Sequence, residues 1–227
     1  DGGREPLEDV ARNLERWVKA LVIRTYAHAK MTTCASAAPG LHVINALSDQ
    51  EHPCQALADM LTLRERWGTC HGRTVAYVGD GNNVANSWIH AAVRFGFQLR
   101  LACPDDLRPS TEVLAWAAKE NGVVTVTNDA AEAVRNADLV VADTWVSMGV
   151  SMDDEDATAR KKLLEPFRVD QVLMSKAKKG VLFMHCLPAH RGEEVTDEVM
   201  DGPDSVIWDE AENRLHAQKG ILAWCLG

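Results

Sequence analysis

The sequence contains no apolar run long enough to cross a lipid bilayer. A transmembrane helix needs roughly 20 consecutive apolar residues, and no apolar stretch in these 227 residues approaches that length. Apolar residues make up 46% of the chain and charged residues 25%, which is ordinary for a globular enzyme. The composition therefore excludes a membrane-spanning protein and indicates one large domain or two small ones.

An excess of positive charge is also missing. The formal net charge is −9 and the isoelectric point is near 5.4. A chain of that charge is repelled by the phosphates of nucleic acids. We therefore expect neither nucleic acid nor membrane among the partners, whereas a local basic pocket for a small anion is compatible with this balance.

Six scattered cysteines contain no C-x-x-C pair and no dense framework. This usage is typical of reduced thiols in a cytosolic-type compartment, so we expect a cytoplasmic protein. The chain begins with Asp1 rather than Met. We expect residues upstream of it, which leaves a targeting peptide and a mitochondrial form open.

Strand-like and helix-like segments alternate along the chain, without repeats or low-complexity stretches. We predict strands at 19–26, 41–48, 74–81, 97–104, 123–128, 138–145 and at the end of 175–188. We predict helices at 5–18, 30–38, 52–68, 83–96, 110–122, 129–137, 153–167, 196–203 and 210–227. Buried strands alternating with helices predict an α/β fold of two lobes, each a parallel sheet flanked by helices. We expect domain boundaries at 1–65, 66–208 and 209–227, with the final helix packing back on the first domain.

Ligands of parallel sheets bind beyond the carboxyl ends of the strands, so polar residues there are the candidates. Arg24 leaves an apolar strand, and its planar guanidinium matches phosphate or carboxylate. With Pro53 at the first helical position, His52 falls at the helix N-cap, and Gln55 projects from the same end. These two could hydrogen-bond a carbonyl oxygen and an amide beside an anion. The alternatives are a salt bridge for Arg24 and a capping interaction for His52.

The stretch VGDGNNVANS follows another strand and suggests a dinucleotide-binding turn. Gly79-x-Gly81-x-x-Val84 lacks the third small residue, and the next strand, LRLACP, does not end in the acidic residue expected for a ribose. The nicotinamide hypothesis is therefore weak. The turn would instead present Asn82 and Asn83, whose amides can bind the carboxylate or ammonium of a zwitterion.

The stretch ADTWVSMG ends a further strand. Asp143 and Ser147 together suit an ammonium group, and Gly149 permits an unusual backbone turn. The alternative is a capped strand-to-loop transition, with the acidic residues 153–156 as a solvated face.

The stretch MHCLPAHRGEEV is open to three interpretations: a metal site, a nucleophile with its base, or a strand end. Adjacent strand residues point to opposite faces, so His185 and Cys186 make a poor nucleophile–base pair. Zinc ligands at suitable spacing are too few. A strand end that places Cys186 over the cleft remains, and Arg214 adds a second cation from the final helix. The strand ends together indicate a site that holds two polar substrates.

The motifs HPCQALADMLT, VGDGNN, DTWVSMG, HCLPAHRGEEV and EAENRLHAQK occur in the order found in ornithine carbamoyltransferases. The chain resembles this family from its first helix to its last residue. HPxQ is typical of the wider aspartate/ornithine transcarbamylase superfamily, whereas Ser-Met-Gly with His-Cys-Leu-Pro is more specific to the ornithine branch. The resemblance implies transfer of the carbamoyl group of carbamoyl phosphate to the δ-amine of L-ornithine, giving citrulline and phosphate. It implies no metal, no organic cofactor and a homotrimer or a multiple of trimers.

The resemblance also implies roles for individual residues. Carbamoyl phosphate would be bound by Arg24, His52, Gln55 and Arg214. The amino-acid end of ornithine would be held by Asn83, Asp143, Ser147 and Met148, with Asn82 as a helper. Cys186 and Leu187 would lie near the reacting δ-amine and the carbamoyl group. Residues 1–65 would be the second half of the carbamoyl phosphate-binding domain, and residues 66–208 the ornithine-binding domain.

The chain departs from the family at one motif, because the phosphate-binding loop Ser-Thr-Arg-Thr-Arg is absent from its sequence. We expect a fragment, with a degenerate relative as the alternative, and weak carbamoyl phosphate binding by these residues alone. Two rival functions remain: a transcarbamylase for another amine, such as putrescine or an acylated ornithine, and a non-catalytic ornithine-sensing or assembly subunit. The intact Ser-Met-Gly segment argues against the first rival. A role in arginine biosynthesis or in breakdown through citrulline is left open.

Overall fold

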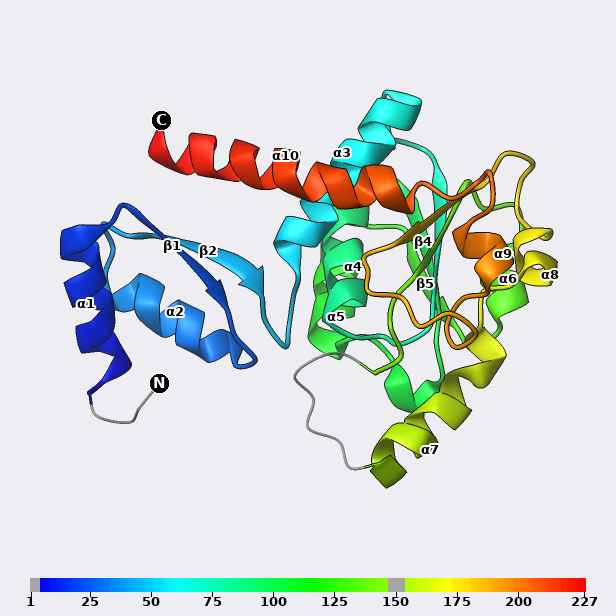
Figure 1. The fold of residues 1–227 in the computed structure, drawn as a ribbon, viewed down its shortest axis with the longest axis horizontal. Coiled ribbons are helices and arrows are strands. Elements are labelled where there is room, and N and C mark those ends of the chain that lie inside the picture. Colours follow the sequence, from blue (N-terminus) through cyan, green and yellow to red (C-terminus); the bar gives the residue numbers. More distant parts are fainter. Residues whose placement is uncertain (1–4, 147–153) are drawn as a thin grey trace.

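The fold is that of a computed structural model, which describes residues 5–146 and 154–227. Two parallel sheets lie side by side (Figure 1). The smaller sheet pairs β1 (Ala20–Arg24) with β2 (His42–Leu47). Helices α1 (Leu7–Trp17) and α2 (His28–Ala37) complete this lobe around a small apolar cluster. The predicted α/β architecture with parallel sheets is confirmed.

The larger sheet has the strand order β5-β4-β3-β6-β7, and all its pairings are parallel. Its strands are β3 (Thr74–Val78), β4 (Gln98–Ala102), β5 (Val124–Thr127), β6 (Leu139–Ala142) and β7 (Leu182–His185). Strands β4 and β5 are added in order on one side of β3, and the chain then crosses to the other side of β3, where β6 and β7 follow. This reversal places a crevice beyond the carboxyl ends of β3 and β6.

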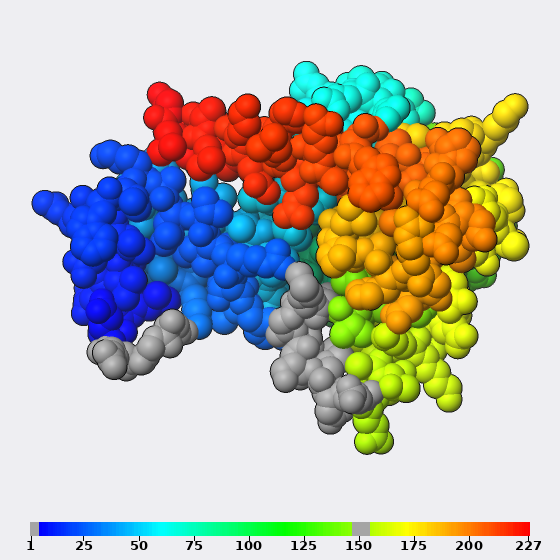
Figure 2. All heavy atoms as spheres, viewed as in Figure 1, coloured from blue at the N-terminus to red at the C-terminus, as the bar shows by residue number. Residues whose placement is uncertain are grey.

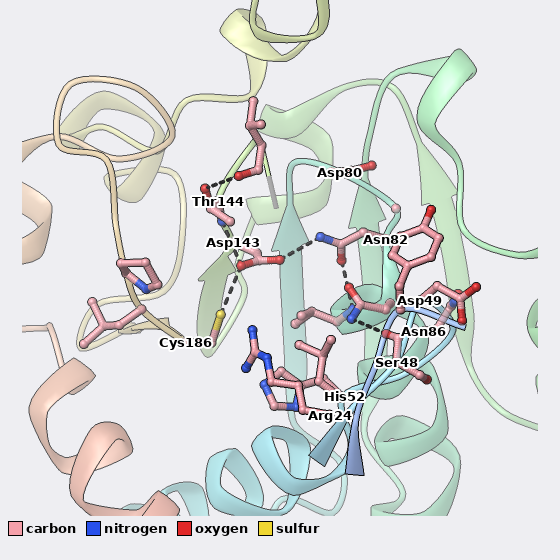
Figure 3. Close-up of a pocket in the computed structure, with 18 of the residues that line it drawn as sticks. Arg24, Ser48, Asp49, His52, Asp80, Asn82, Asn86, Asp143, Thr144 and Cys186 are labelled. Carbon is pink, nitrogen blue, oxygen red and sulfur yellow. Dashed lines mark hydrogen bonds between the residues drawn. The ribbon is translucent and has the colours of Figure 1, made fainter. Parts of the chain in front are cut away.

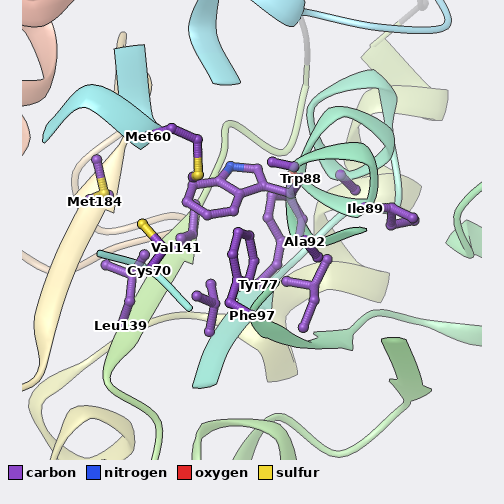
Figure 4. Packing of buried hydrophobic residues seen from close by; sticks show 14 of the residues in the cluster. Met60, Cys70, Tyr77, Trp88, Ile89, Ala92, Phe97, Leu139, Val141 and Met184 are labelled. Atoms are coloured by element: carbon purple, nitrogen blue, oxygen red, sulfur yellow. The ribbon is translucent and has the colours of Figure 1, made fainter. Parts of the chain in front are cut away.

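Helices cover both faces of the larger sheet, because every residue of β3 and β6 is apolar or small and buried. One face packs under α4 (Asn83–Phe95) and α5 (Thr111–Lys119), with Trp88 and Phe97 in edge-to-face contact at 6.0 Å between ring centroids (Figure 4). The other face packs against α6 (Ala130–Val134), α8 (Gln171–Met174) and α9 (Asp197–Met200). Helix α7 (Asp154–Leu164) lies at the rim of this lobe (Figure 1).

Two long helices connect the lobes. Helix α3 (Pro53–Trp67) begins with proline at its first position and ends at Gly68, whose φ of 75° suits glycine. Helix α10 (Ile207–Leu226) crosses α3 and continues over the smaller lobe (Figures 1 and 2). Asn213 joins the two helices, since its side-chain amide donates to Thr62 Oγ1 at 3.0 Å and to Glu65 Oε2 at 2.7 Å.

The predicted element bounds differ from the structure mainly at the carboxyl-terminal end. The helix expected at 196–203 is limited to the single turn of α9, and the final helix begins at Ile207 rather than at residue 210. Short 3-10 turns at Asp105–Leu107 and Glu165–Phe167 were not predicted. Within the described part of the chain, no helix combines the length and apolarity needed to cross a membrane.

Candidate active site

A cavity of about 510 Å³ opens where the strand ends of both sheets meet. Its walls come from the ends of β1 and β2, the turn after β3, the segment after β6 and the turn after β7 (Figure 3). It therefore lies in the crevice that the strand order of the larger sheet creates. The expected site residues that line it are Arg24, His52, Asn82, Asn83, Asp143, Cys186, Leu187 and Arg214.

The wall next to the smaller lobe carries two arginines and a neutral histidine. Arg24 and Arg214 both line the cavity, and Arg24 forms no ion pair with any residue that the structure describes. Burial, with the charges of Arg214 and Arg24, lowers the pKa of His52 to about 4. The imidazole is therefore uncharged at neutral pH, and two cations are concentrated beside an uncharged ring.

His52 occupies the N-cap of α3 as predicted, but its side chain does not cap the helix. Its backbone N–H donates to Ser87 Oγ at 2.7 Å, which anchors the residue between α3 and α4. Its ring Nδ1 is buried and has no hydrogen-bond partner among residues 5–146 and 154–227. The capping alternative is wrong, and the ring remains available to a bound molecule.

Gln55 lies one turn into α3, is 1% exposed and is not part of the cavity wall. Its amide nitrogen Nε2 donates to Asp59 Oδ1 at 2.8 Å and to Glu210 Oε1 at 3.1 Å. Burial raises the pKa of Asp59 to about 7, and it raises the pKa of Glu210 well above its usual value. The sequence analysis did not single out these two acids. Asp59 follows Gln55 by one helical turn, which is a readable signal, but nothing local pairs it with α10.

The opposite wall is organised by Asp143, which is 4% exposed (Figure 3). Its Oδ2 accepts from Asn82 Nδ2 at 2.7 Å, and its Oδ1 accepts from Cys186 Sγ at 3.0 Å and from the Thr144 backbone N–H at 2.8 Å. These three donors hold the carboxylate in one orientation at the cavity edge. A fixed carboxylate of this kind suits an ammonium group.

Asn82 is already occupied by the protein. Its Oδ1 accepts from the backbone N–H groups of Val84 and Ala85, which makes it the side-chain cap of α4, and also from the Tyr77 hydroxyl at 3.2 Å. Because its Nδ2 holds Asp143, Asn82 orients the carboxylate. It lines the cavity as predicted, but its amide is used for structure.

Asn83 connects the two lobes at the cavity floor. Its Nδ2 donates to the backbone carbonyl of Ser48 at 2.8 Å, and Ser48 follows β2. The side-chain amide thus spans from the turn after β3 to the smaller sheet while it lines the cavity. Ser147 and Met148, the remaining predicted ornithine contacts, lie outside the described residues.

His185 and Cys186 point in opposite directions, as expected for neighbours at a strand end. His185 is fully buried, and its Nδ1 accepts the Leu187 backbone N–H at 2.9 Å. Cys186 faces the cavity, and burial together with the charge of Asp143 raises the pKa of its thiol well above the usual value. A neutral thiol is a poor nucleophile. Leu187 lines the cavity next to it, with a positive φ of 57°.

Buried Asp80 and half-buried Arg160 form an ion pair that was not predicted from the sequence. Arg160 of α7 also donates through Nε to the Trp145 carbonyl at 3.0 Å, and both charged residues line the cavity. The pKa of Asp80 is raised by burial, although the guanidinium opposes the shift. An aspartate directly after a buried strand was the available signal, but its partner lies 80 residues away.

One group of potential metal ligands occurs in the described part of the chain, formed by His190, Glu193 and Glu194. Glu193 pairs with Lys161 at 2.6 Å, and Glu194 accepts the backbone N–H of His190 at 2.5 Å. Both acids are thus engaged within the protein, and the group receives no metal assignment.

Matches to known proteins cover both lobes. Residues 1–65 match the family model described as the carbamoyl-P binding domain of aspartate/ornithine carbamoyltransferase, and residues 71–225 match its Asp/Orn binding domain. A cavity with cations on one wall and a fixed carboxylate on the other, between two such lobes, is the site of a two-substrate transferase. The chain belongs to the aspartate/ornithine carbamoyltransferase family.

Relatives of high sequence identity include ornithine carbamoyltransferases. The ornithine carbamoyltransferase of Rhodopseudomonas palustris strain BisA53 is 53% identical over 226 residues, which cover 100% of this chain and 71% of that protein. The solved structure of ornithine carbamoyltransferase from Pyrococcus furiosus superposes with a TM-score of 0.91 at 46% identity, over 98% of this chain and 71% of that one. The structure of ornithine carbamoyltransferase from Thermus thermophilus superposes with a TM-score of 0.89 at 40% identity, over 100% of this chain and 73% of that one.

Proposed function

We propose that this protein transfers the carbamoyl group of carbamoyl phosphate to the δ-amine of L-ornithine, giving L-citrulline and phosphate. The observation that carries the proposal is the opposition of charges across one cavity. Arg24 and Arg214 lie at one end with the neutral ring of His52, and the hydrogen-bonded carboxylate of Asp143 lies at the other. A phosphorylated substrate fits the first end and an amino acid the second.

The cationic end accounts for carbamoyl phosphate binding and for loss of phosphate. Two guanidinium groups match phosphate oxygens, and the positive end of the α3 dipole adds favourable potential. Attack on the carbamoyl carbon gives a tetrahedral oxyanion, which cations and N–H donors fixed around it stabilise. Phosphate then leaves as an anion toward the same arginines.

The anionic end accounts for ornithine binding. Asp143 offers a carboxylate to an ammonium group, and Asn83 lines the cavity beside it. The neutral thiol of Cys186 lies on the same wall and touches Asp143 directly. Only the neutral δ-amine is nucleophilic, so the rate rises with pH through the effective pKa of that amine. Holding both substrates in line supplies up to ~7–11 kcal/mol of the barrier reduction.

Finer features belong to the same proposal. We assign Ser147 and Met148 to the amino-acid end of ornithine, and we propose a homotrimer or a multiple of trimers, a role in arginine biosynthesis and a cytoplasmic location. The family resemblance supports the first two. The likeness to a solved structure named as an anabolic ornithine carbamoyltransferase, from Campylobacter jejuni, supports the third, and the scattered cysteines with no disulfide among the described residues support the last. We propose no metal and no organic cofactor for the transfer, because carbamoyl phosphate is already an activated carbamoyl donor with phosphate as its leaving group.

The test combines an intact-mass measurement of the purified protein with a citrulline-forming assay. Citrulline formation that requires both carbamoyl phosphate and L-ornithine supports the proposal. A mass near 24.9 kDa with ornithine binding but no citrulline contradicts it and favours a non-catalytic ornithine-binding subunit. Putrescine in place of ornithine tests the alternative acceptor, which is excluded if its kcat/KM is far lower.

A further inference from the structure

A histidine and a glutamate lie buried together behind the strand end that carries Cys186. His185, the last residue of β7, is 0% exposed, and Glu194 is 1% exposed. The distance between His185 Nε2 and Glu194 Oε1 is 3.3 Å. Neither residue lines the cavity, and the transfer mechanism above uses neither. Burying polar side chains costs free energy unless their hydrogen-bonding groups are used, so their contacts show what they hold.

The contacts of the His185 ring assign the position of its proton. Nδ1 accepts the backbone N–H of Leu187 at 2.9 Å. A ring nitrogen that accepts a hydrogen bond carries no proton, so the proton of the ring lies on Nε2. Nε2 has no hydrogen-bond partner among residues 5–146 and 154–227, and Glu194 Oε1 is the oxygen that lies beside it. This electronegative oxygen stabilises a proton on Nε2, and Glu194 therefore favours the tautomer that can accept from Leu187.

The Leu187 N–H closes a turn at the cavity wall. The φ of Leu187 is 57°, in the left-handed region that is disfavoured for residues with a side chain, so this backbone has to be held. Cys186 and Leu187 both line the cavity. Cys186 Sγ donates to Asp143 Oδ1 at 3.0 Å (Figure 3). The turn therefore sets the shape of the wall and also supplies one of the donors that orient the Asp143 carboxylate.

The buried pair is itself anchored on both sides. The backbone N–H of His185 donates to Glu210 Oε2 at 2.9 Å. On the other side, Glu194 Oε1 accepts the backbone N–H of His190 at 2.5 Å, and the Glu194 carbonyl accepts the N–H of Val169 at 2.9 Å. The carboxyl oxygen beside the ring is thus fixed by the segment that follows the turn.

We propose that Glu194 and His185 are positioning residues for the transfer: Glu194 sets the tautomer of His185, and His185 Nδ1 holds the turn that presents Cys186 and Leu187 at the cavity wall. The inference rests on the proposed function and deepens it, because it assigns a role to the buried side chains of the stretch HCLPAHRGEEV. Both residues act through the turn rather than on the substrates.

A first kinetic test compares two replacements that put an amide in different places. In His185→Asn the amide group falls near the position of Nδ1 and can accept the Leu187 N–H, whereas in His185→Gln it falls near the position of Nε2. The fall in kcat/KM for L-ornithine should be about tenfold or more greater in His185→Gln than in His185→Asn. Equal losses, or the reverse order, overturn the proposal.

A second kinetic test replaces the acid and uses its neighbour as the matched control. Glu193 is partly exposed and pairs with Lys161 at 2.6 Å. Glu194→Ala should lower kcat/KM for L-ornithine roughly tenfold or more, and Glu194→Gln, which keeps an oxygen beside Nε2, should retain most of the wild-type value. Glu193→Gln should behave as wild type. The proposal is overturned if Glu194→Ala behaves like the control, or if Glu194→Gln loses as much as Glu194→Ala.

A spectroscopic measurement reads the tautomer without depending on activity. Nitrogen-15 NMR of the imidazole groups, with the His185 signals assigned by their loss in His185→Asn, should show a protonated Nε2 and an unprotonated Nδ1 in the wild-type protein near pH 7. Glu194→Ala should shift the ring toward the other tautomer. A protonated Nδ1 in the wild type, or an unchanged ring in Glu194→Ala, overturns the proposal. Failure of the proposed function appears differently, as absence of citrulline with the expected tautomer in place.

Discussion

The two sheets differ in how deeply their strands are buried. All five residues of β3 and all four of β6 are buried, with helices on both faces of the larger sheet. Strand β1 has no fully buried residue, and Val22 in its middle is 55% exposed. Yet β1 ends in Arg24, which lines the cavity. The lobe with the smaller core thus contributes a charged group to the cavity although it supplies little packing, whereas the larger lobe supplies most of the packing together with Asp143 and Cys186.

The largest expected effect is a packing effect in the larger lobe. Trp88 is 1% exposed and meets Phe97 edge-to-face. Replacing it with alanine removes a large buried ring and leaves a cavity, so Trp88→Ala should lower the free energy of unfolding by about 3–5 kcal/mol. Urea denaturation followed by circular dichroism measures this loss. A loss below about 1 kcal/mol would mean that the larger core is not the main source of stability.

A nearly comparable effect should appear in catalysis when the smaller lobe loses its cation. Arg24→Gln removes one of the two guanidinium groups that line the cavity and that we propose to lie beside the developing oxyanion and phosphate. We expect kcat/KM for carbamoyl phosphate to fall roughly 10²–10³-fold, with the free energy of unfolding changed by less than about 1 kcal/mol. Initial rates at varied carbamoyl phosphate check this. Arg12→Gln, on an exposed pair with Asp9, is the control and should behave as wild type.

Asp59 and His52, which lie where the two lobes meet, should make the free energy of unfolding depend on pH. The pKa of Asp59 is raised to about 7 in the folded protein, compared with 3.8 in the unfolded chain. The stability that the protonated group contributes to folding is therefore complete below pH 3.8 and is lost as pH rises through 7. The folded pKa of His52 is lowered to about 4, so its contribution is complete above 6.5 and is lost as pH falls through 4. The two groups therefore change the free energy of unfolding with pH in opposite directions, each by at most ~1.4 kcal/mol per pH unit.

Thermal and urea unfolding between pH 4 and 7 separates these two groups. Relative to wild type, Asp59→Asn should gain stability as pH rises, and His52→Gln should lose stability over the same range. Parallel curves for wild type and Asp59→Asn would show that Asp59 is not protonated in the folded protein.

The smallest expected effect belongs to the exposed middle of β1. Val22→Ala should change the free energy of unfolding by no more than about 0.5 kcal/mol, because this side chain is mostly in solvent. Chemical denaturation is again the measurement. A cost above 1 kcal/mol would mean that another part of the protein assembly covers this strand and that the contrast between the lobes is smaller than it looks.

The sequence predicts features that depend on local order along the chain. Strand periodicity and strand ends located Arg24, Asp143 and Cys186, and proline at a helix start located His52. An asparagine before α4 was equally readable as a helix cap, a role that Asn82 fulfils together with its bond to Asp143. Strand ends and helix starts can be read from the sequence because the hydrogen bonding of turns and caps is set within a few residues.

Contacts between distant elements could not be predicted in the same way. The pairs Asp59–Glu210 and Asp80–Arg160 join residues 151 and 80 positions apart. Nothing in the local pattern specifies which helix packs against which strand end. Gln55 illustrates the consequence: its position on α3 was predicted, but the two acids that take its amide nitrogen were not.

The packing of α10 on α3 has a consequence for how the phosphate end is assembled. His52 and Gln55 belong to α3, and Arg214 follows Asn213, whose hydrogen bonds to Thr62 and Glu65 hold α10 against α3. These groups therefore form one rigid block that moves together if the lobes change their angle. These side chains are already fixed in position when the protein folds, so they lose little further conformational entropy when a substrate binds. The block is also tied to the larger lobe, since the His52 backbone N–H donates to Ser87 Oγ and Glu210 accepts from the His185 backbone N–H. Motion of the smaller lobe would therefore change the distance between Arg24 on β1 and this preorganised block.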